Sequence, residues 1–319
     1  MPSAIYLGYT GGCRPIPPLG RHGGAPIVRG GRPYLAAPRD RPGTEIDCKE
    51  KLEKVMNDAS VSDRLSLAVE AAREAGRLTL EYFRRDDLAV ERKEDDSPVT
   101  VADRKAEELL RQTIAAAFPD DAILGEELSP KEGSSGFRWI LDPIDGTKSF
   151  VHGVPLYATL VGLERGAESV AGVICIPPLG ECLYAAIGGG AWYAVGNRAP
   201  RAARVSACSR LAEGLFVTSE VAGFAAHGRR EAFDRLQTAS RLTRTWGDAY
   251  GYLLVATGRA EVMVDPVMAV WDAAALLPIL VEAGGTFTDW QGRATIHAGE
   301  GVGTNGQVLD EVLATIRPG

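Results

Sequence analysis

Few side chains in this sequence are suited to soft metal sites or to disulfide frameworks. The 319 residues include four histidines and five cysteines. The histidines are far apart and lack zinc-site spacing: His22, His152, His227 and His297. The cysteines form no framework of paired spacings, and an odd count without a secretion signal is typical of reduced thiols. These scarcities argue against a zinc enzyme and a disulfide-stabilised secreted domain, and they predict a cytoplasmic protein.

Long apolar runs and an excess of basic charge are also missing. No apolar run reaches the length that a membrane-spanning helix needs. The net charge is −7 and the isoelectric point lies near 5.3, which argues against nucleic acid as the main partner. The composition, 45% hydrophobic and 24% charged, fits a soluble globular protein of one large or two fused domains. We therefore expect neither nucleic acid nor a membrane as a partner.

The N-terminal stretch differs from the rest of the chain in charge and composition. Residues 1–44 hold six arginines and one aspartate, and they are rich in glycine and proline without sustained periodicity. Such a composition predicts disorder. Its arginine content is typical of a transit peptide, but no amphipathic helix is visible and Ser3 is the only serine before Ser60. We expect residues 1–58 to be a disordered N-terminal extension, and residues 1–55 to be a dispensable tail or a misassigned start before Met56.

Apolar periodicity predicts a mixed succession of helices and strands after this extension. The first helix is expected over residues 63–84, and a second runs from Thr100 to Phe118, where Pro119 ends it. Strands are expected at residues 122–125, 138–142, 157–163, 170–176 and 181–186. The segment Pro177-Pro178-Leu179-Gly180 predicts an antiparallel hairpin between the last two. Further helices are expected near residues 229–239, 247–257 and 271–283, and there is no internal repeat.

The most informative segment is Asp142-Pro143-Ile144-Asp145-Gly146-Thr147, which follows the apolar run Trp139-Ile140-Leu141. Proline fixes its own φ and holds the two carboxylates close together. Hard cations such as Mg²⁺ prefer oxygen ligands, which a pair of aspartates on a rigid turn supplies. The amides of Gly146 and Thr147 follow at a helix start, where they can contact a phosphate. The alternative is a plain turn, since Asp-Pro and Asp-Gly are common turn dipeptides.

Three further acidic sites accompany this segment. Glu126 and Glu127 follow the apolar strand, Asp272 follows Trp271 at the start of an apolar helical run, and Asp103 lies three residues after Thr100. Each has a purely structural alternative. The glutamates can belong to a solvated loop, Asp272 can complement the helix dipole, and Asp103 can form half of a capping box.

Taken together and in this order, the Gly-Glu-Glu, Asp-Pro-Ile-Asp-Gly-Thr and Trp-Asp segments resemble the signatures of the inositol monophosphatase family of Mg²⁺-dependent, lithium-sensitive phosphatases. The resemblance runs from about Val61 to the C-terminus. It implies an α+β fold, a layered α-β-α-β-α sandwich of the inositol monophosphatase and fructose-1,6-bisphosphatase type. Residues 59–200 would form an N-terminal α+β half with most metal ligands, and residues 201–319 a C-terminal α/β half with Asp272 and the substrate wall. Family members are commonly homodimers.

The resemblance also implies a role for each acidic residue. A first Mg²⁺ would be held by Glu126, Asp142 and the backbone carbonyl of Ile144. A second would be held by Asp142, Asp145 and Asp272, and a weaker third by Glu126 with Glu127. Two or three such ions neutralise the phosphoryl oxygens of a monoester and activate water, so no Ser, Cys or His nucleophile is required.

Further roles follow from the same resemblance. Thr147 would pair with Asp103 and polarise the attacking water, with Glu127 close by, while the Gly146 and Thr147 amides would contact phosphate. Lys93 stands where the family often has a lysine, but the charged run of residues 91–96 is more typical of a solvated loop.

The substrate is indicated by residues 244–252 and by one later aspartate. By resemblance, Gly247, Asp248 and Asp265 would contact the alcohol half of the substrate, where inositol-specific members usually carry a small uncharged residue at the position of Asp248. Two acids suit a substrate with positive charge, and the pattern resembles the histidinol-phosphatase branch of the family. We therefore expect L-histidinol phosphate, with inositol 1-phosphate as the runner-up. The alternatives are a helix N-cap for Asp248 and an Asp-Pro turn for Asp265.

Other readings of the chain are weaker. Gly301-Val302-Gly303-Thr304-Asn305-Gly306 matches the dinucleotide-binding pattern of an oxidoreductase, but the chain ends before the acidic residue that the motif needs. We expect these glycines to form the loop before the last helix, and Gly188-Gly189-Gly190 to form a turn. A relative that binds a phosphate ligand without turnover remains a remote alternative.

Overall fold

The computed structural model of the protein describes residues 59–93 and 97–317. The expected disorder of residues 1–58 lies outside the described residues. The described residues form a seven-stranded sheet, a five-stranded sheet and a two-stranded hairpin. The hairpin consists of β1 (Val90–Arg92) and β2 (Pro98–Thr100), which run antiparallel.

The seven-stranded sheet keeps the order of the chain, β3-β4-β5-β6-β7-β8-β9. Its strands are β3 (Ala122–Gly125), β4 (Phe137–Asp145), β5 (Ala158–Arg165), β6 (Glu168–Ile176), β7 (Glu181–Ala186), β8 (Ala191–Val195) and β9 (Arg201–Ala202). Only the β3–β4 pair is parallel, so both of these strands end at the same edge of the sheet. The predicted hairpin is confirmed, because β6 and β7 are antiparallel and are joined by the 3₁₀ turn η1 (Pro177–Leu179).

The five-stranded sheet has the order β11-β10-β12-β14-β13. Its strands are β10 (Leu215–Val217), β11 (Leu242–Arg244), β12 (Val262–Asp265), β13 (Thr286–Thr288) and β14 (Gly301–Thr304). The three strands that come first along the chain are parallel, while β14 runs antiparallel to both β12 and β13. Gly301 and Gly303 therefore belong to a strand, and the expectation that they form a loop is wrong. A side chain at Gly303 would come within 2.7 Å of the Tyr252 ring, so close packing explains this glycine.

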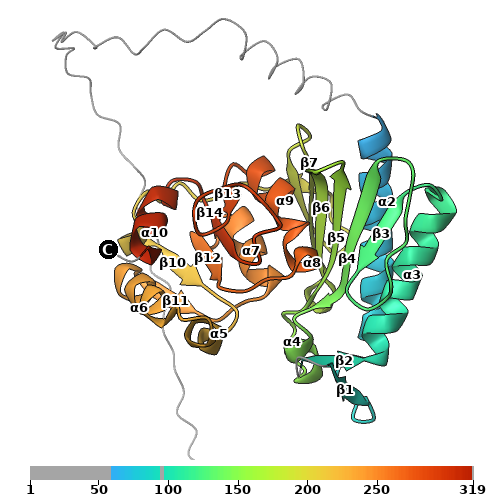
Figure 1. The fold of residues 1–319 in the computed structure, drawn as a ribbon, viewed down its shortest axis with the longest axis horizontal. Coiled ribbons are helices and arrows are strands. Elements are labelled where there is room, and N and C mark those ends of the chain that lie inside the picture. Colours follow the sequence, from blue (N-terminus) through green and yellow to red (C-terminus); the bar gives the residue numbers. More distant parts are fainter. Residues whose placement is uncertain (1–58, 94–96, 318–319) are drawn as a thin grey trace, which may run out of the picture. The chain divides into compact units, whose positions relative to one another are not determined.

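Helices separate and cover the two sheets (Figure 1). α2 (Ala59–Leu80) and α3 (Val101–Ala117) pack on one face of the seven-stranded sheet, and α9 (Leu276–Glu282) packs on its other face. α7 (Ala249–Ala256) lies with α9 between the sheets and is apolar on all sides, as a helix between two sheets must be. α6 (Arg230–Ala239) and α10 (Leu309–Ile316) cover the far face of the five-stranded sheet, beside α5 (Val221–Ala226).

Among the described residues, three large apolar cores fill the spaces between these layers, and a small fourth core contains Phe150 and Tyr157. Alternation along β6 shows how one strand serves two of them, because Val173 faces the α2 and α3 core while Ile174 faces the core around α7 and α9. A third core, with Phe216, Phe224 and Phe233, lies under α5, α6 and α10. The predicted layered α-β-α-β-α sandwich is thus the arrangement that the structure shows.

Two expected helices differ from the observed ones. The first ends at Leu80 instead of residue 84, and Arg84 has a left-handed φ of 61° in the turns that follow. The helix expected over residues 271–283 is two helices, α8 (Val270–Ala273) and α9. Pro278 explains the break, because its ring has no N–H and would clash with the carbonyl of Ala274 in a continuous helix. The second predicted helix is confirmed, with Thr100 as its N-cap and Phe118 as its C-cap.

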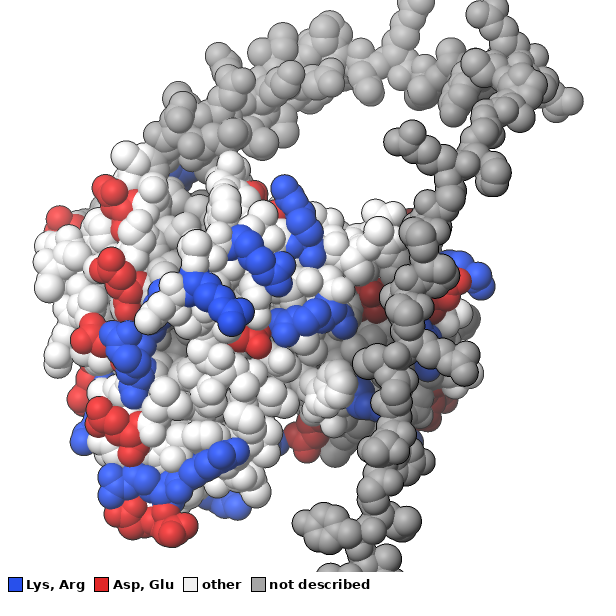
Figure 2. Space-filling model, turned by 180° about the vertical axis from the view of Figure 1, so that it is seen from behind, with Lys and Arg blue, Asp and Glu red and all other residues white. Residues whose placement is uncertain are grey.

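Acidic and basic side chains are interspersed on one face of the molecule (Figure 2). Exposed ion pairs such as Arg230–Asp234, at 2.9 Å, are worth only about 0–1 kcal/mol each. The stability of the fold therefore rests mainly on the three large apolar cores. Among the described helices, none combines the length and the apolar character that crossing a bilayer requires.

Candidate functional site

An irregularity at the end of β4 positions the first two acidic residues. β4 pairs with β5 in regular register up to Asp142, and the register shifts between Asp142 and Asp145. Side chains three residues apart on a regular strand point to opposite faces, and the extra residue of a bulge reverses that relation. Asp142 and Asp145 can therefore approach each other, and both are buried. A backbone amide holds each carboxylate, that of Ile144 at 3.0 Å from Asp142 and that of Ala249 at 2.7 Å from Asp145.

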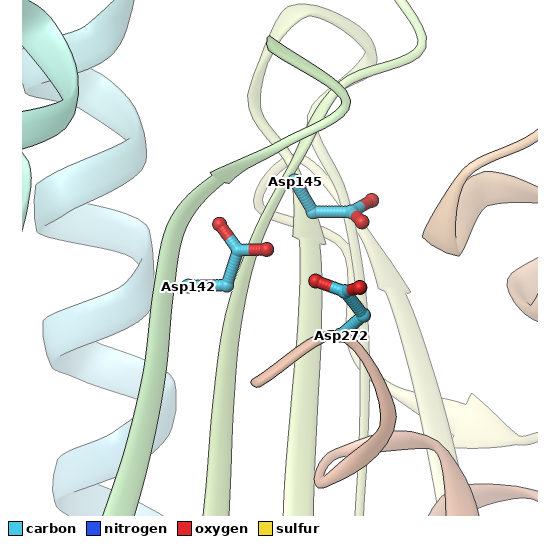
Figure 3. Close-up of side chains that lie close together, drawn as sticks. All are labelled: Asp142, Asp145 and Asp272. Atoms are coloured by element: carbon cyan, nitrogen blue, oxygen red, sulfur yellow. The ribbon is translucent and has the colours of Figure 1, made fainter. Parts of the chain in front are cut away.

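Asp272 completes a cluster of three carboxylates. It lies in the first turn of α8, and its Oδ2 accepts a hydrogen bond from the Ala269 amide at 2.7 Å, so it also caps that helix. Oxygen atoms of Asp142, Asp145 and Asp272 all lie within 4.8 Å of one another. Figure 3 shows the three side chains converging from β4 and from the start of α8.

The clustered carboxylates have strongly perturbed ionisation. Burial raises the pKa of Asp142 well above its usual range, and the neighbouring charges of Glu126, Asp145 and Asp272 act in the same direction. Burial likewise raises the pKa of Asp145, and it raises that of Asp272 to about 7. Hard oxygen donors that repel one another in this way fit a divalent cation, since a bound cation would relieve the repulsion.

Glu126 and Glu127 lie beside this cluster, directly after β3, and are joined by Lys93. The Lys93 ammonium donates hydrogen bonds of 2.6 Å to Glu126 Oε1 and to Glu127 Oε1. Burial opposes its charge, but the two carboxylates outweigh burial and raise the pKa of Lys93 above its usual value. The expectation of a solvated loop at Lys93 is therefore wrong for this side chain, because distant residues in the sequence provide its partners.

A buried glutamate that the sequence analysis did not single out supports this segment. Glu107, on α3, is fully buried and accepts hydrogen bonds from the amides of Glu127, at 2.7 Å, and Leu128, at 3.2 Å. Arg111, one helical turn later, binds Glu107 Oε1 at 2.7 Å and also donates to the Leu128 carbonyl. A side chain at Gly125 would come within 2.0 Å of Glu107, so glycine is required there. The four-residue spacing of Glu107 and Arg111 on a predicted helix was the signal in the sequence that could have indicated this ion pair.

Thr147 and Asp103 meet at the edge of the cluster. The Thr147 hydroxyl lies 3.4 Å from Asp103 Oδ1 and 3.0 Å from the Ile144 carbonyl, and it can donate to one of them at a time. Asp103 is fully buried and also closes the capping box of α3 with Thr100, whose hydroxyl donates to it at 2.6 Å. Burial raises the pKa of Asp103. Asp103 thus forms half of a capping box, which was its structural alternative, and this does not prevent it from also binding Thr147.

A cavity of about 500 Å³ opens over the carboxylates. Its lining includes Glu126, the three aspartates, Gly146 and Thr147, together with Asp248 and Asp265. Asp248 stands at the N-cap position of α7, but its side chain does not cap that helix. Its Oδ2 would lie only 2.5 Å from a Cβ at Gly146, where φ is 80°, so glycine lets the two segments approach.

Asp265 ends β12 and is more constrained than Asp248. It is buried, and it accepts hydrogen bonds from the Ser219 amide at 3.2 Å and the Tyr252 hydroxyl at 3.0 Å. Burial raises its pKa to about 6 against the effect of these bonds. Gly247 is buried against the Ser219 backbone, where a Cβ would come within 2.3 Å of Ser219 Cα.

Two charged side chains at the cavity were not anticipated. Lys148 and Glu220 both line it and form an exposed ion pair of 2.6 Å. Glu220 follows β10, which no strong pattern in the sequence predicted.

Comparison with known proteins agrees with this geometry. The family model for the inositol monophosphatase family matches residues 60–318. The chain belongs to the inositol monophosphatase family. Among its relatives, the histidinol-phosphatase of Chlorobaculum parvum is 46% identical over 80% of this chain and 97% of its own, and that of Mycobacterium tuberculosis is 41% identical over 81% and 99%. The crystal structure of the extragenic suppressor protein suhB from Bartonella henselae superposes with a TM-score of 0.75, at 30% identity, over 81% of this chain and 99% of that one.

Membership of the inositol monophosphatase family confirms the predicted fold and enzyme class. The relatives are named as phosphatases, and the carboxylate cluster described above fits the metal dependence of the family. Trp271 and Asp272 lie in α8, which packs against β4 and β5, so a residue from the later part of the chain joins the cavity.

Proposed function

We propose that this member of the inositol monophosphatase family is a Mg²⁺-dependent phosphatase that converts L-histidinol phosphate and water into L-histidinol and inorganic phosphate. One observation supports this most: the carboxylate cluster and two further acids, Asp248 and Asp265, line the same cavity. The cluster suits the phosphate end of the substrate with its metals, and the two acids suit an alcohol half that carries an amine and an imidazole. The names of the Chlorobaculum and Mycobacterium relatives point to the same substrate.

The metal ligands we propose are those that the family resemblance implies. Glu126, Asp142 and the Ile144 carbonyl would hold one Mg²⁺; Asp142, Asp145 and Asp272 would hold a second; Glu126 and Glu127 would help hold a third. Bound Mg²⁺ would offset the charge of the phosphoryl oxygens and acidify water at the site. Lys93 binds Glu126 and Glu127 in this structure, so a third cation there would have to compete with its ammonium.

The protein groups would then orient the reactants. Thr147, held between Asp103 and the Ile144 carbonyl, would accept a hydrogen bond from the attacking water while donating its own proton to Asp103. The amides of Gly146 and Thr147 would contact the phosphate. Because positioning and electrostatics supply most of the catalysis in phosphoryl transfer, no covalent nucleophile is needed.

Selectivity between substrates would come from the acidic wall of the cavity, which Asp248 and Asp265 form. An ammonium or imidazolium group gains a charge-assisted hydrogen bond at Asp248, which a neutral polyol cannot match. Asp265 is already bound by Ser219 and Tyr252, so it would act mainly by fixing that wall and by its charge.

The test is a comparison of kcat/KM for L-histidinol phosphate and inositol 1-phosphate with saturating Mg²⁺. We expect histidinol phosphate to be preferred. A preference of tenfold or more for inositol 1-phosphate, about 1.4 kcal/mol of transition-state stabilisation, would reject the substrate while keeping the phosphatase. The absence of phosphate release from every phosphomonoester tested would reject both and favour a ligand-binding relative.

A further inference from the structure

Two cysteines face each other across the β6–β7 hairpin, outside the carboxylate cavity. Cys175 and Cys182 are directly opposed in the antiparallel register, and their sulfur atoms lie 2.7 Å apart as free thiols. Opposed residues in antiparallel strands have Cα atoms about 4.5–5.5 Å apart. That spacing lies within the range of about 4.4–6.8 Å that disulfides span, so a bond between them needs only small movements.

A cavity gives the pair contact with small molecules. Each cysteine is only 3% exposed, but both line a cavity of about 240 Å³ together with Arg73 and Gly180. A water molecule takes about 30 Å³, so a compact oxidant of similar size fits easily. Larger disulfide reagents would be excluded from thiols this deeply placed.

Arg73 makes the two thiols unequal. Its guanidinium lies beside Cys182 and can donate a hydrogen bond to that sulfur. The pKa of Cys182 is lowered by the hydrogen bond from Cys175 and by the charge of Arg73, against the effect of burial. Burial raises the pKa of Cys175, the other thiol of the pair. The thiolate is the reactive form of cysteine, and the Arg73 hydrogen bond favours it at Cys182, so we assign Cys182 as the nucleophile of the pair.

We propose that Cys175 and Cys182 are a redox site that hydroperoxides oxidise to a reversible disulfide. The Cys182 thiolate attacks one oxygen of hydrogen peroxide, the O–O bond breaks, and hydroxide leaves, so Cys182 becomes a sulfenic acid. The Cys175 thiol then attacks this sulfur; the S–S bond forms, the S–O bond breaks, and the Cys175 proton leaves with the oxygen as water. In total two thiols lose two electrons and one peroxide is reduced. A dithiol such as dithiothreitol reverses the reaction by exchange.

The site is separate from the proposed catalysis. Both cysteines face the core under α2, whereas their neighbours Ile174 and Leu183 face the opposite side of the sheet. The disulfide would thus close the hairpin on the face away from the space between the two sheets. Its formation can be measured without any assay of phosphate release.

The decisive measurement uses the full chain with Cys13, Cys48 and Cys208 changed to serine, so that the pair is isolated. After brief treatment with hydrogen peroxide, denaturation and alkylation, we expect the peptide or peptides with Cys175 and Cys182 to lose about 2 Da and take up no alkyl group. Prior reduction with dithiothreitol should restore two alkylation sites. The peroxide treatment is chosen so that it oxidises the half-buried Cys208 in the chain that keeps all its cysteines. If Cys175 and Cys182 are both still fully alkylated after that treatment, the proposal is overturned.

Single substitutions test the order of the steps. In the same background, Cys175→Ser should accumulate a sulfenic acid at Cys182 that dimedone traps when the protein is denatured in its presence, while Cys182→Ser should react at least about tenfold more slowly at Cys175. Arg73→Gln should slow disulfide formation, and Arg73→Lys should restore most of the rate. Equal trapping in the two serine variants would overturn the assignment of Cys182 as nucleophile. Should either variant unfold, the mass measurement on the isolated pair still decides whether the disulfide forms.

Discussion

At the scale of single residues, the main feature of the site is a set of carboxylates held close together. Asp142, Asp145 and Asp272 are held by backbone amides at fixed positions, so they cannot relax away from one another. Their mutual repulsion therefore helps to raise their pKa values and favours the binding of a cation between them.

Removing one charged ligand should abolish turnover. We expect Asp145→Asn or Asp272→Asn to lower kcat by several orders of magnitude at saturating Mg²⁺, since each change removes a carboxylate from the proposed second metal site. Phosphate release gives the rate, and the rise in melting temperature on adding Mg²⁺ reports metal binding separately. Glu168→Gln, at an exposed position on β6, is the matched control. Near-normal turnover in either aspartate variant would contradict the site assignment.

Asp248 should act on substrate choice more than on chemistry. We expect Asp248→Ala to lower kcat/KM for L-histidinol phosphate by about tenfold or more, the worth of a hydrogen bond to a charged group. Turnover of a neutral phosphomonoester should change much less, because it loses no ion pair. Asp248→Asn keeps the shape without the charge and should resemble the alanine variant. Equal losses of kcat/KM on both substrates would show that Asp248 shapes the site but does not select for a positively charged substrate.

The pH dependence of stability should change when Mg²⁺ is bound. Asp272 has a pKa of about 7 in the metal-free fold, above the value of about 3.9 in an unfolded chain. Its contribution to stability is therefore full below that unfolded value and is lost as pH rises through about 7. Ligands must be ionised to bind metal, so the gap in melting temperature between Mg²⁺-saturated and chelated protein should widen from about pH 6 to about pH 8. A gap independent of pH would contradict this.

At the scale of elements, α3 holds the Gly-Glu-Glu segment through one side chain. Glu107 binds two amides of the segment after β3 and is paired with Arg111 on its own helix. β3 contributes only four residues to the sheet, so this support fixes the position of Glu126 and Glu127.

Glu107→Gln should therefore weaken both folding and catalysis. We expect a loss of about 1–3 kcal/mol in the free energy of unfolding, because Arg111 loses its charged partner and an amide its acceptor. We also expect a lower kcat, as Glu126 and Glu127 become less well placed. Denaturant unfolding and phosphate release provide the two measurements. Glu108→Gln, the exposed neighbour on α3, is the control, and the same behaviour in both variants would count against a positioning role.

At the scale of the whole molecule, the family match begins at residue 60, and the N-terminal extension lies outside it. Residues 1–55 offer few periodic apolar side chains for docking on a core. We expect their deletion to leave the melting temperature and the phosphatase activity nearly unchanged. Thermal unfolding of the full and shortened chains makes the comparison, and a clear fall in stability on deletion would show that the extension packs.

Sequence alone determined the chemistry of the donors and much of the local structure. Asp142 and Asp145 are carboxylates beside a proline, and the strand before them and the helix from Thr100 follow from periodicity and capping, which act over a few residues. Local patterns failed where a distant contact decided the outcome. The sequence predicted a solvated Lys93 because its partners, Glu126 and Glu127, are neighbours only in space. It predicted a loop at β14 because the reason for its glycines, close packing against Tyr252, is a contact with a residue far away in the sequence.

The tertiary structure decided which of these groups work together. The bulge in β4 turns Asp145 toward Asp142, and the packing of α8 against β4 and β5 brings Asp272 to both. Burial then changes their ionisation, since a carboxylate in a low-dielectric interior beside other carboxylates resists losing its proton. Residue types and short-range order are properties of the chain, but distance and dielectric environment exist only once the two sheets have packed around α7 and α9.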